Sequence, residues 1–212
     1  MPSHSFAMER AISVFDEDRF AMDQAVQHNG DHLEVTTGRL RLVALDPELA
    51  RLEDTDRSAF FEALGAQLES AWPPVAIDAP DLAGRLEALS RRPHEAGWGG
   101  WIILMGWTPG GPDRAVGIGG FFGPPDENGE IEIGYAMLPS FREQGLATEA
   151  VEGLLGWALE DDRVKAVRAH TLAHLYASRR VLEKTGFTAA PGAEDAAGDE
   201  TVRYDFVKSE AA

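Results

Sequence analysis

The spacing of the apolar residues changes from that of β-strands to that of a helix between residues 137 and 147. This change restricts the fold more than any other feature of the chain. Before it, three segments are typical of β-strands, at 98–107, 115–122 and 130–137, and turns rich in Pro, Gly and Asp separate them. After it, residues 147–159 carry apolar side chains at helical spacing, and another strand is expected at 164–171. Short turns predict an antiparallel meander for the first three strands. The intervening helix predicts a parallel pair joined by a crossover for the last two.

The flanking segments complete an α/β pattern. Residues 35–44 alternate like a strand, and a helical block follows, in which Asp46 is the expected N-cap and Pro47 the first helical residue. Trp72-Pro73-Pro74 is expected to end the second helix of this block. The remaining elements are expected as helices over 47–52, 60–68, 81–91 and 177–185 and as a strand over 201–207.

Residues 1–34 differ from the rest of the chain. They carry an excess of acidic residues, and Met8, Ile12, Phe15, Met22 and Val26 follow an approximate helical period. We therefore expect an N-terminal helical extension over 1–34 and one domain over 35–212. The extension could pack on that domain or on a second subunit, so a homodimer is one arrangement the sequence allows.

Composition excludes several classes of function. The chain of 212 residues has no cysteine, which rules out disulfides, thiolate metal sites and a cysteine nucleophile. The net charge of −17 disfavours nucleic-acid binding; it fits a cationic partner or serves solubility alone. No apolar run approaches the roughly 18 residues of a membrane span, and the N-terminus lacks a secretory pattern. A cytoplasmic protein without membrane, nucleic acid or metal as a partner is expected.

The segment Arg142–Thr148 is the strongest candidate for a binding site. Gly145 allows a tight turn, and the amides of Leu146, Ala147 and Thr148 lie in the first helical turn, where backbone donors lack internal acceptors. The helix dipole adds partial positive charge at this end. Such a turn can hold a pyrophosphate, although the spacing alone favours an ordinary loop.

Three motifs in order carry a resemblance to a known family. They are Glu130–Leu138 as a strand, Arg142-x-x-Gly145-x-Ala147 as a loop and Ala177–Phe187 as a closing helix. Together they resemble the GNAT superfamily of acyl-CoA-dependent N-acyltransferases over about residues 38–207, most closely the branch of ribosomal-protein alanine N-acetyltransferases. The resemblance implies a GNAT fold: a mixed, mostly antiparallel central sheet with a parallel strand pair and flanking helices. Neither a Gly-x-Gly-x-x-Gly nor a Gly-Lys-Ser/Thr motif opens a helix.

The resemblance implies acetyl-CoA as co-substrate. The pantetheine arm would lie beside the strand 130–138 like an added strand, and the loop amides would hold the diphosphate with Arg142 nearby. The cofactor-binding residues implied in this way are Met137, Leu138, Arg142, Gln144, Gly145, Leu146, Ala147, Thr148 and Ser178. The expected reaction is direct attack of a primary amine, from a protein N-terminus or a small molecule, on the thioester in a ternary complex.

Glu132 is the candidate base for this reaction. It alternates with Ile131 and Ile133, so its side chain points to the opposite face of the strand, and it matches the acidic position of the family's Glu-x-Gly-Tyr strand. A base is needed because the attacking amine must lose a proton. The alternative is a half-exposed glutamate paired with a cross-strand cation.

The group that protonates the leaving thiolate is not settled by the resemblance. Ser178 matches a family serine near the CoA sulfur, although it could equally cap the first turn of its helix. The family's asparagine falls at Leu175 and its tyrosine at Leu182, while Tyr176 occupies a different position. Water or Ser178 would then have to serve.

Trp72 is a candidate wall of the acceptor pocket, and with Glu132 it forms the expected substrate-binding set; the alternative is a core tryptophan. The missing asparagine and tyrosine keep a second function open, a GNAT-like protein that binds acyl-CoA or a partner without turnover. A third is a phosphate-binding interaction domain unrelated to CoA.

Overall fold

The computed structural model describes residues 25–29, 32–76, 82–90, 95, 97–106, 111–193 and 196–208. Within them the strands are β1 (Ala25–Asn29), β2 (His32–Thr36), β3 (Leu40–Ala44), β4 (Ala66–Gln67), β5 (Gly100–Met105), β6 (Asp113–Phe121), β7 (Glu130–Met137), β8 (Ala166–Leu172), β9 (Thr188–Ala189) and β10 (Thr201–Val207). The helices are α2 (Pro47–Thr55), α3 (Arg57–Ala63), α4 (Leu82–Ser90), α5 (Leu146–Leu159) and α6 (Tyr176–Lys184), with a 3₁₀ turn, η2, over Pro139–Phe141.

The strands form one mixed sheet in the order β1-β2-β3-β5-β6-β7-β8-β10-β9, and β4 pairs with β6. The meander β5-β6-β7 is antiparallel and β7 runs parallel to β8 across the α5 crossover, so both predictions are confirmed. Asp46 caps α2 through its carboxylate, with Pro47 as the first helical residue, as expected. No helix in the described ranges is long and apolar enough to cross a bilayer.

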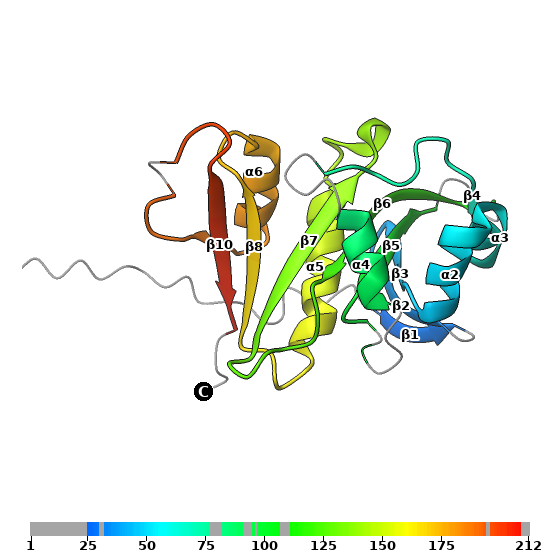
Figure 1. Cartoon of the computed structure of the whole chain (residues 1–212), viewed down its shortest axis with the longest axis horizontal. Helices are drawn as coiled ribbons and strands as arrows, with labels where there is room; N and C mark the ends of the chain where they lie inside the picture. Colours follow the sequence, from blue (N-terminus) through cyan, green and yellow to red (C-terminus); the bar gives the residue numbers. More distant parts are fainter. Residues whose placement is uncertain are drawn as a thin grey trace, which may run out of the picture.

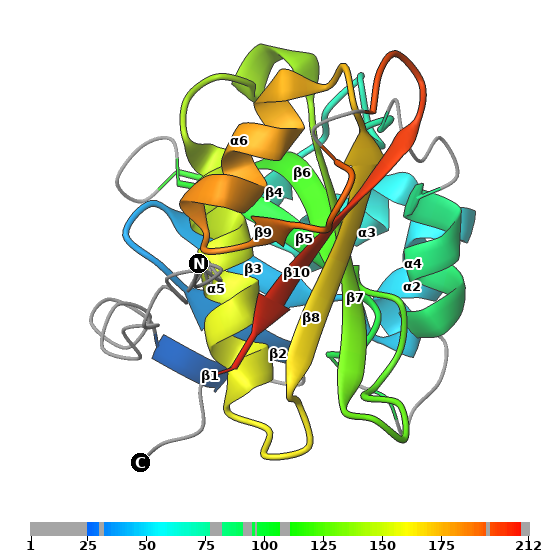
Figure 2. The same ribbon diagram turned by 90° about the vertical axis from the view of Figure 1, so that its left-hand side faces the viewer.

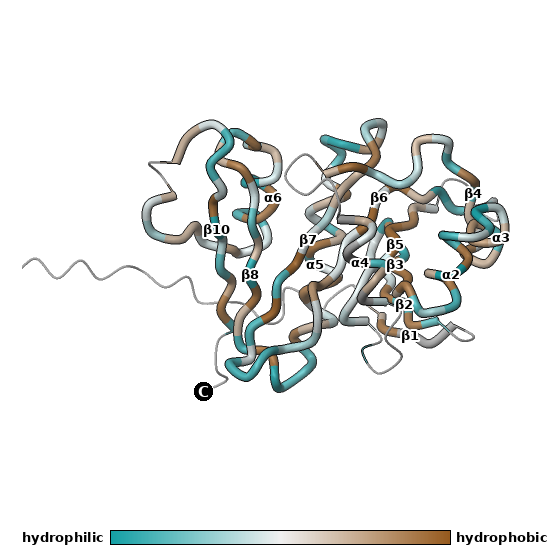
Figure 3. The backbone as a smooth tube through the Cα atoms, in the orientation of Figure 1, coloured by the Kyte–Doolittle hydropathy of each residue, from teal (hydrophilic) through white to brown (hydrophobic). Residues whose placement is uncertain are grey.

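The helices cover both faces of the sheet. Helices α5 and α6 lie on one face and α2 and α4 on the other (Figures 1 and 2). Helix α5 approaches β3 closely at Gly153, where a Cβ atom would lie 2.8 Å from a methyl of Leu42. Trp157 of the same helix packs on Trp98 and Trp101. Figure 3 shows that hydrophobic residues concentrate on the central strands, whereas the turns after β6 and α5 are hydrophilic.

The sheet opens between β7 and β8. These strands pair only over Glu130–Glu132 and Ala166–Arg168. Beyond Glu132 they diverge, and Figure 1 shows them close together at their first residues and apart at their carboxyl ends. On its other edge β7 stays paired with β6 up to Met137. One edge of the second half of β7 thus faces a gap instead of a strand.

The structure differs from the expectations at several element boundaries. The expected strand 35–44 is divided into β2 and β3. The helix expected over 60–68 ends at Ala63, before Gly65, whose φ of 64° leaves the helical conformation. Helix α3 therefore stops well before Trp72-Pro73-Pro74, and the prediction that these residues end it is wrong.

The N-terminal segment also differs from its expected form in the part that the structure describes. Val26, expected on a helix, lies in β1, which pairs with β2 over its whole length, and β2 pairs with β3. Residues 25–29 and 32–34 therefore extend the central sheet. The remainder of the expected helical extension, residues 1–24, and Trp107 lie outside the described residues.

Candidate functional site

A cavity of about 630 Å³ opens where β7 and β8 diverge. Its walls come from the end of β7, the loop leading into α5, the first turns of α6 and the segment at Val75 and Ala76. The lining residues from the loop and α5 are Phe141, Arg142, Glu143, Gly145, Leu146, Ala147 and Thr148. The strand that loses its neighbour and the loop expected to bind an anion thus meet in one cavity.

The loop before α5 presents backbone donors to this cavity. Gly145 is the N-cap of α5 with a φ of 76°, and no side chain caps the helix. Glu143 also has a positive φ, of 60°. Alternating left-handed residues turn successive N–H groups to one side, which creates an anion-binding concavity at a helix N-terminus. The amides of Leu146, Ala147 and Thr148 are therefore not taken up by a capping side chain.

The backbone of β7 offers hydrogen-bonding groups to the gap at alternate residues. The amide of Leu138 donates to the carbonyl of Val116, so Leu138 faces β6 and does not line the cavity. In an antiparallel pair the backbone groups of neighbouring residues point to opposite edges. Tyr135 and Met137 therefore turn their backbone groups toward β8, and both line the cavity. Of the two expected contacts on this strand, Met137 faces the gap and Leu138 does not.

The side chains of Arg142 and Gln144 each donate to a backbone carbonyl. The Nε of Arg142 donates to the carbonyl oxygen of Met137 at 3.1 Å, which fixes its guanidinium at the end of β7. The side-chain amide of Gln144 donates to the carbonyl of Ser140 at 3.0 Å, and Gln144 is not among the residues that line the cavity. Arg180 and Lys184 of α6 line it as well. The cavity thus gathers three cations in a chain with a large net negative charge.

Arg39, which the sequence analysis missed, lies against the same loop. Its Nη1 donates to the carbonyl of Gln144 at 3.0 Å and its Nε to Glu149 at 2.6 Å. Burial alone would raise the pKa of the Glu149 carboxyl, but hydrogen bonds from Thr37 and Arg39 outweigh it, so the pKa is lowered. No local pattern could have found this contact, because Arg39 and Glu149 are 110 residues apart.

Ser178 faces β7. It lies in the first turn of α6, which begins after Leu175 without a capping side chain, so the alternative of a capping serine is not realised. Its hydroxyl lies 3.3 Å from the phenol oxygen of Tyr135, and the phenol lies 3.2 Å from the Ser178 carbonyl oxygen. Both residues line the cavity.

Glu132 does not line the cavity, and its side chain lies on the opposite face of the sheet from α5. Its neighbours Ile131 and Ile133 are buried, as the alternation predicted, while its side chain is 38 % exposed. One carboxylate oxygen lies 3.1 Å from the Nδ1 of His170 on β8. Glu130, two residues earlier, forms an ion pair with Arg168. Glu132 thus occupies the last paired position of β7 before the gap.

Trp72 is not brought to the cavity. Its side chain is 4 % exposed and packs on Phe60 and Phe61. Its indole N–H donates to Glu53 at 2.7 Å. Burial is the main cause of the raised pKa of the Glu53 carboxyl, which Glu87 raises further. The residues of this segment that reach the cavity are Val75 and Ala76.

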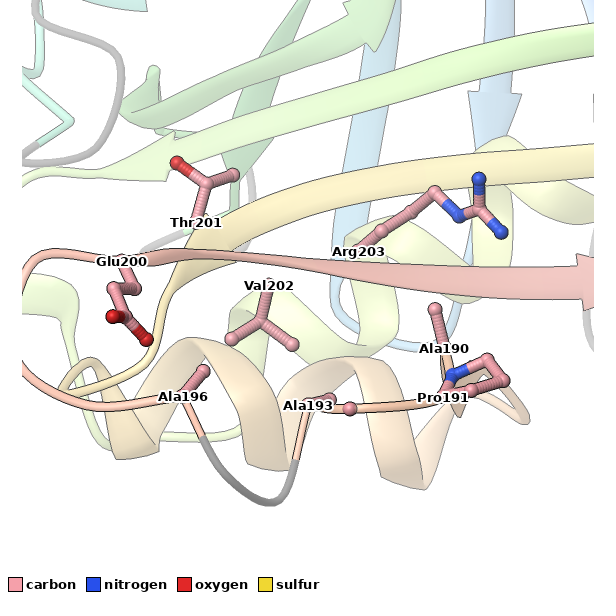
Figure 4. A pocket seen from close by; sticks show the side chains of 9 residues that line it. Ala190, Pro191, Ala193, Ala196, Glu200, Thr201, Val202 and Arg203 are labelled. Atoms are coloured by element: carbon pink, nitrogen blue, oxygen red, sulfur yellow. The ribbon is translucent and has the colours of Figure 1, made fainter.

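A second cavity of about 660 Å³ lies between the loop after β9 and the start of β10. Its lining contains Glu200 and Arg203 as charged residues. Val202 points toward Ala193 and Ala196 across it, whereas Arg203 points away (Figure 4). None of the residues singled out from the sequence lines this cavity. In the described parts of the chain, no group of three or more His, Asp or Glu side chains could hold a metal ion.

The chain is similar to known acetyltransferases in sequence and in fold. The sequence profile of the acetyltransferase (GNAT) domain matches residues 48–188. A curated relative, the uncharacterized N-acetyltransferase YjdG of Bacillus subtilis (strain 168), is 36% identical over 152 residues, which cover 71% of this chain and 87% of the relative.

Two solved structures share the fold. A RimL ribosomal L7/L12 alpha-N-protein acetyltransferase in its apo form superposes with a TM-score of 0.52 and 17% identity, covering 87% of this chain and 100% of its own. The microcin C7 self-immunity acetyltransferase MccE, in complex with acetyl-CoA and AMP, superposes with a TM-score of 0.51 and 16% identity, covering 81% and 94%.

Proposed function

This chain belongs to the GNAT acetyltransferase family and is an acetyl-CoA-dependent acyltransferase, and we propose that its acceptor is a primary amine. The amine belongs to a protein N-terminus or a small molecule, and it attacks the thioester directly in a ternary complex. The alternative, a protein that binds acyl-CoA without turnover, is favoured by one observation. The position of the family's tyrosine is taken by Leu182, which is 1% exposed.

The observation that carries the proposal is the gap between β7 and β8 beyond Glu132, which leads into the cavity at the start of α5. A pantetheine arm in this gap would pair with backbone groups of Tyr135 and Met137 in place of β8. The diphosphate would then accept hydrogen bonds from the amides at 145–148, where the helix dipole also favours an anion.

Three cations support the placement of the anionic end of the coenzyme. Arg142, Arg180 and Lys184 line the cavity. Because the chain as a whole carries a charge of −17, a polyanion needs local positive charge of this kind. Arg142, already directed by the Met137 carbonyl, is the residue we assign to the diphosphate.

We assign Glu132 as the base that accepts the proton of the amine. It lies at the end of the paired part of β7, on the face opposite the helices α5 and α6, so the amine would approach from that face. Its hydrogen bond with His170 holds the carboxylate in one orientation. Trp72 would support the acceptor side indirectly, through the segment that carries Val75 and Ala76.

The decisive experiment combines two measurements on the full chain. Calorimetry with CoA tests the binding site, and thiol release from acetyl-CoA in the presence of Ser- and Ala-starting peptides or spermidine tests the transfer. Binding with thiol release supports the transferase. Binding with no release for any amine favours the non-catalytic alternative. No binding of CoA or acetyl-CoA, with an unchanged Tm, would contradict both.

A further inference from the structure

Two hydroxyl groups meet in the lining of the cavity, one from the sheet and one from a helix. The phenol of Tyr135 projects from β7 and the hydroxyl of Ser178 from the first turn of α6, 3.3 Å apart. The phenol O–H also donates a hydrogen bond to the Ser178 carbonyl oxygen at 3.2 Å. The phenol oxygen is thus held against α6 by two contacts to one residue.

The position of Tyr135 along β7 is informative. Neighbouring residues of a strand are separated by about 3.3 Å, so Tyr135 lies roughly 7 Å from Met137 and 10 Å from Glu132. An arm that runs from the diphosphate site along β7 passes Met137 first, then Tyr135, and reaches Glu132 last. The thioester, which must lie within reach of the base, would have its sulfur beside Tyr135.

Tyr135 and Glu132 also point to opposite faces of the sheet, because they are three positions apart along the strand and successive side chains alternate. The phenol lies on the face covered by α5 and α6, and the carboxylate lies on the other. An amine that attacks from the side of Glu132 would push the leaving sulfur toward the side of Tyr135.

We propose that Tyr135 is the acid that protonates the leaving CoA thiolate, and that Ser178 orients its phenol. This inference rests on the proposed function. The nitrogen lone pair forms the N–C bond, and the C–S bond breaks with its electron pair on sulfur. The phenol O–H turns from the Ser178 carbonyl to the sulfur, which takes the phenol proton, while Glu132 takes a proton from the amine. Ser178 donates a hydrogen bond to the phenolate, which regains a proton from solvent through the open cavity.

The two groups differ moderately in acidity. The tyrosine phenol ionises near pH 10 and the cysteine thiol near pH 8.5 in water, so transfer of the proton from phenol to thiolate is uphill by about 1.5 pKa units. A hydrogen bond from the phenol stabilises the thiolate even before the proton is transferred. Tyr176 also lines the cavity with a phenol and is therefore the rival candidate. Its side chain is 71% exposed.

The test is a titration of the thiol of bound CoA, followed by the ultraviolet absorbance of the thiolate. This readout needs no acceptor. We expect the thiol to ionise about one pKa unit lower on the wild-type protein than on Tyr135→Phe, a tenfold change in its ionisation constant, because a hydrogen bond to the thiolate is lost. Ser178→Ala should give a smaller change, and a matched removal of the other phenol, Tyr176→Phe, should give none.

Turnover provides a second readout. With a Ser-starting peptide, Tyr135→Phe should lower kcat by about 100-fold while the Kd for CoA stays within about twofold, in line with the loss of a general acid. An unchanged thiol titration and kcat in Tyr135→Phe, or a shift in Tyr176→Phe instead, would overturn the assignment and leave the proposed function intact. Failure of the wild-type protein to bind CoA would overturn both.

Discussion

Arg39 and Glu149 connect the turn between β2 and β3 to the first turn of α5. The Arg39 Nε lies 2.6 Å from the Glu149 carboxylate, whose other oxygen accepts hydrogen bonds from the Arg39 amide and the Thr37 hydroxyl. The Arg39 Nη1 also holds the carbonyl of Gln144. A carboxylate beside an anion-binding loop would repel a diphosphate, and these contacts neutralise it.

Replacement of Arg39 by alanine should therefore weaken CoA binding by about tenfold, since the loop loses its support and Glu149 loses its counter-charge. Calorimetry in dilute and in concentrated salt would measure the change. The double variant Arg39→Ala/Glu149→Gln should recover part of the affinity. Arg51→Ala, on the exposed side of α2, is the control. Equal affinities for Arg39→Ala and the control would contradict the role of Arg39.

Stability should depend on pH through Glu149. Its pKa is lowered below the usual value of 4.5 in the folded chain, so the ionised form stabilises the fold above that value. This contribution is lost as the pH falls through the folded pKa. Urea unfolding should therefore show the wild type more stable than Glu149→Gln near neutral pH, with a difference that shrinks in acid. A constant difference across this range would show that the carboxylate charge is not responsible.

The contribution of Glu53 to stability should change with pH in the opposite direction to that of Glu149. Burial raises its pKa above 4.5, so ionisation at higher pH opposes folding. Glu53→Gln keeps an acceptor for the Trp72 indole and removes the charge. We expect this variant to have a higher Tm than the wild type near neutral pH and an equal Tm well below pH 4.5. A lower Tm at neutral pH would mean that the charged hydrogen bond outweighs the cost of burial.

Gly145→Val should abolish CoA binding, because the φ of 76° that turns the loop amides into the cavity is unfavourable for a β-branched residue. Gly192→Val provides a matched control: it has a φ of 88°, and its added side chain would meet no atom within 4 Å. Both variants should lose about 1–2 kcal/mol of stability from backbone strain, measured by urea unfolding. Unchanged CoA affinity in Gly145→Val would refute the loop assignment.

Glu132→Gln should lower kcat by 10²-fold or more, the range typical of a lost general base, with little change in the Kd for CoA. Glu130→Gln is the matched control, because it lies on the same face of β7 but pairs with Arg168. Thiol release with a Ser-starting peptide across pH would measure both variants. If the two variants had the same kcat and pH profile as the wild type, the base would have to be another group.

Local sequence patterns were sufficient for most of the fold. Strand β7 and strand β10 occupy the predicted residues, and α5 begins one residue before its predicted start. The predicted element boundaries were wrong where a single backbone conformation decides them, as at Gly65. They were also wrong where pairing across the sheet decides them, as at Val26 in β1. Trp72 shows the same limit. Its place in the sequence was compatible with a wall of the acceptor pocket, but its packing on Phe60 and Phe61 places it in the core.

The sequence by itself determined the strands and helices from β5 to α6 and the tight turn at Gly145, because periodicity and backbone conformation depend on residues close together in the chain. Only the tertiary structure decided which side chains meet there. Tyr135 and Ser178 are 43 residues apart and Arg39 and Glu149 are 110 apart. Such contacts depend on how far β8 diverges from β7 and how closely α5 approaches β3, and those distances are set by the packing of the whole core.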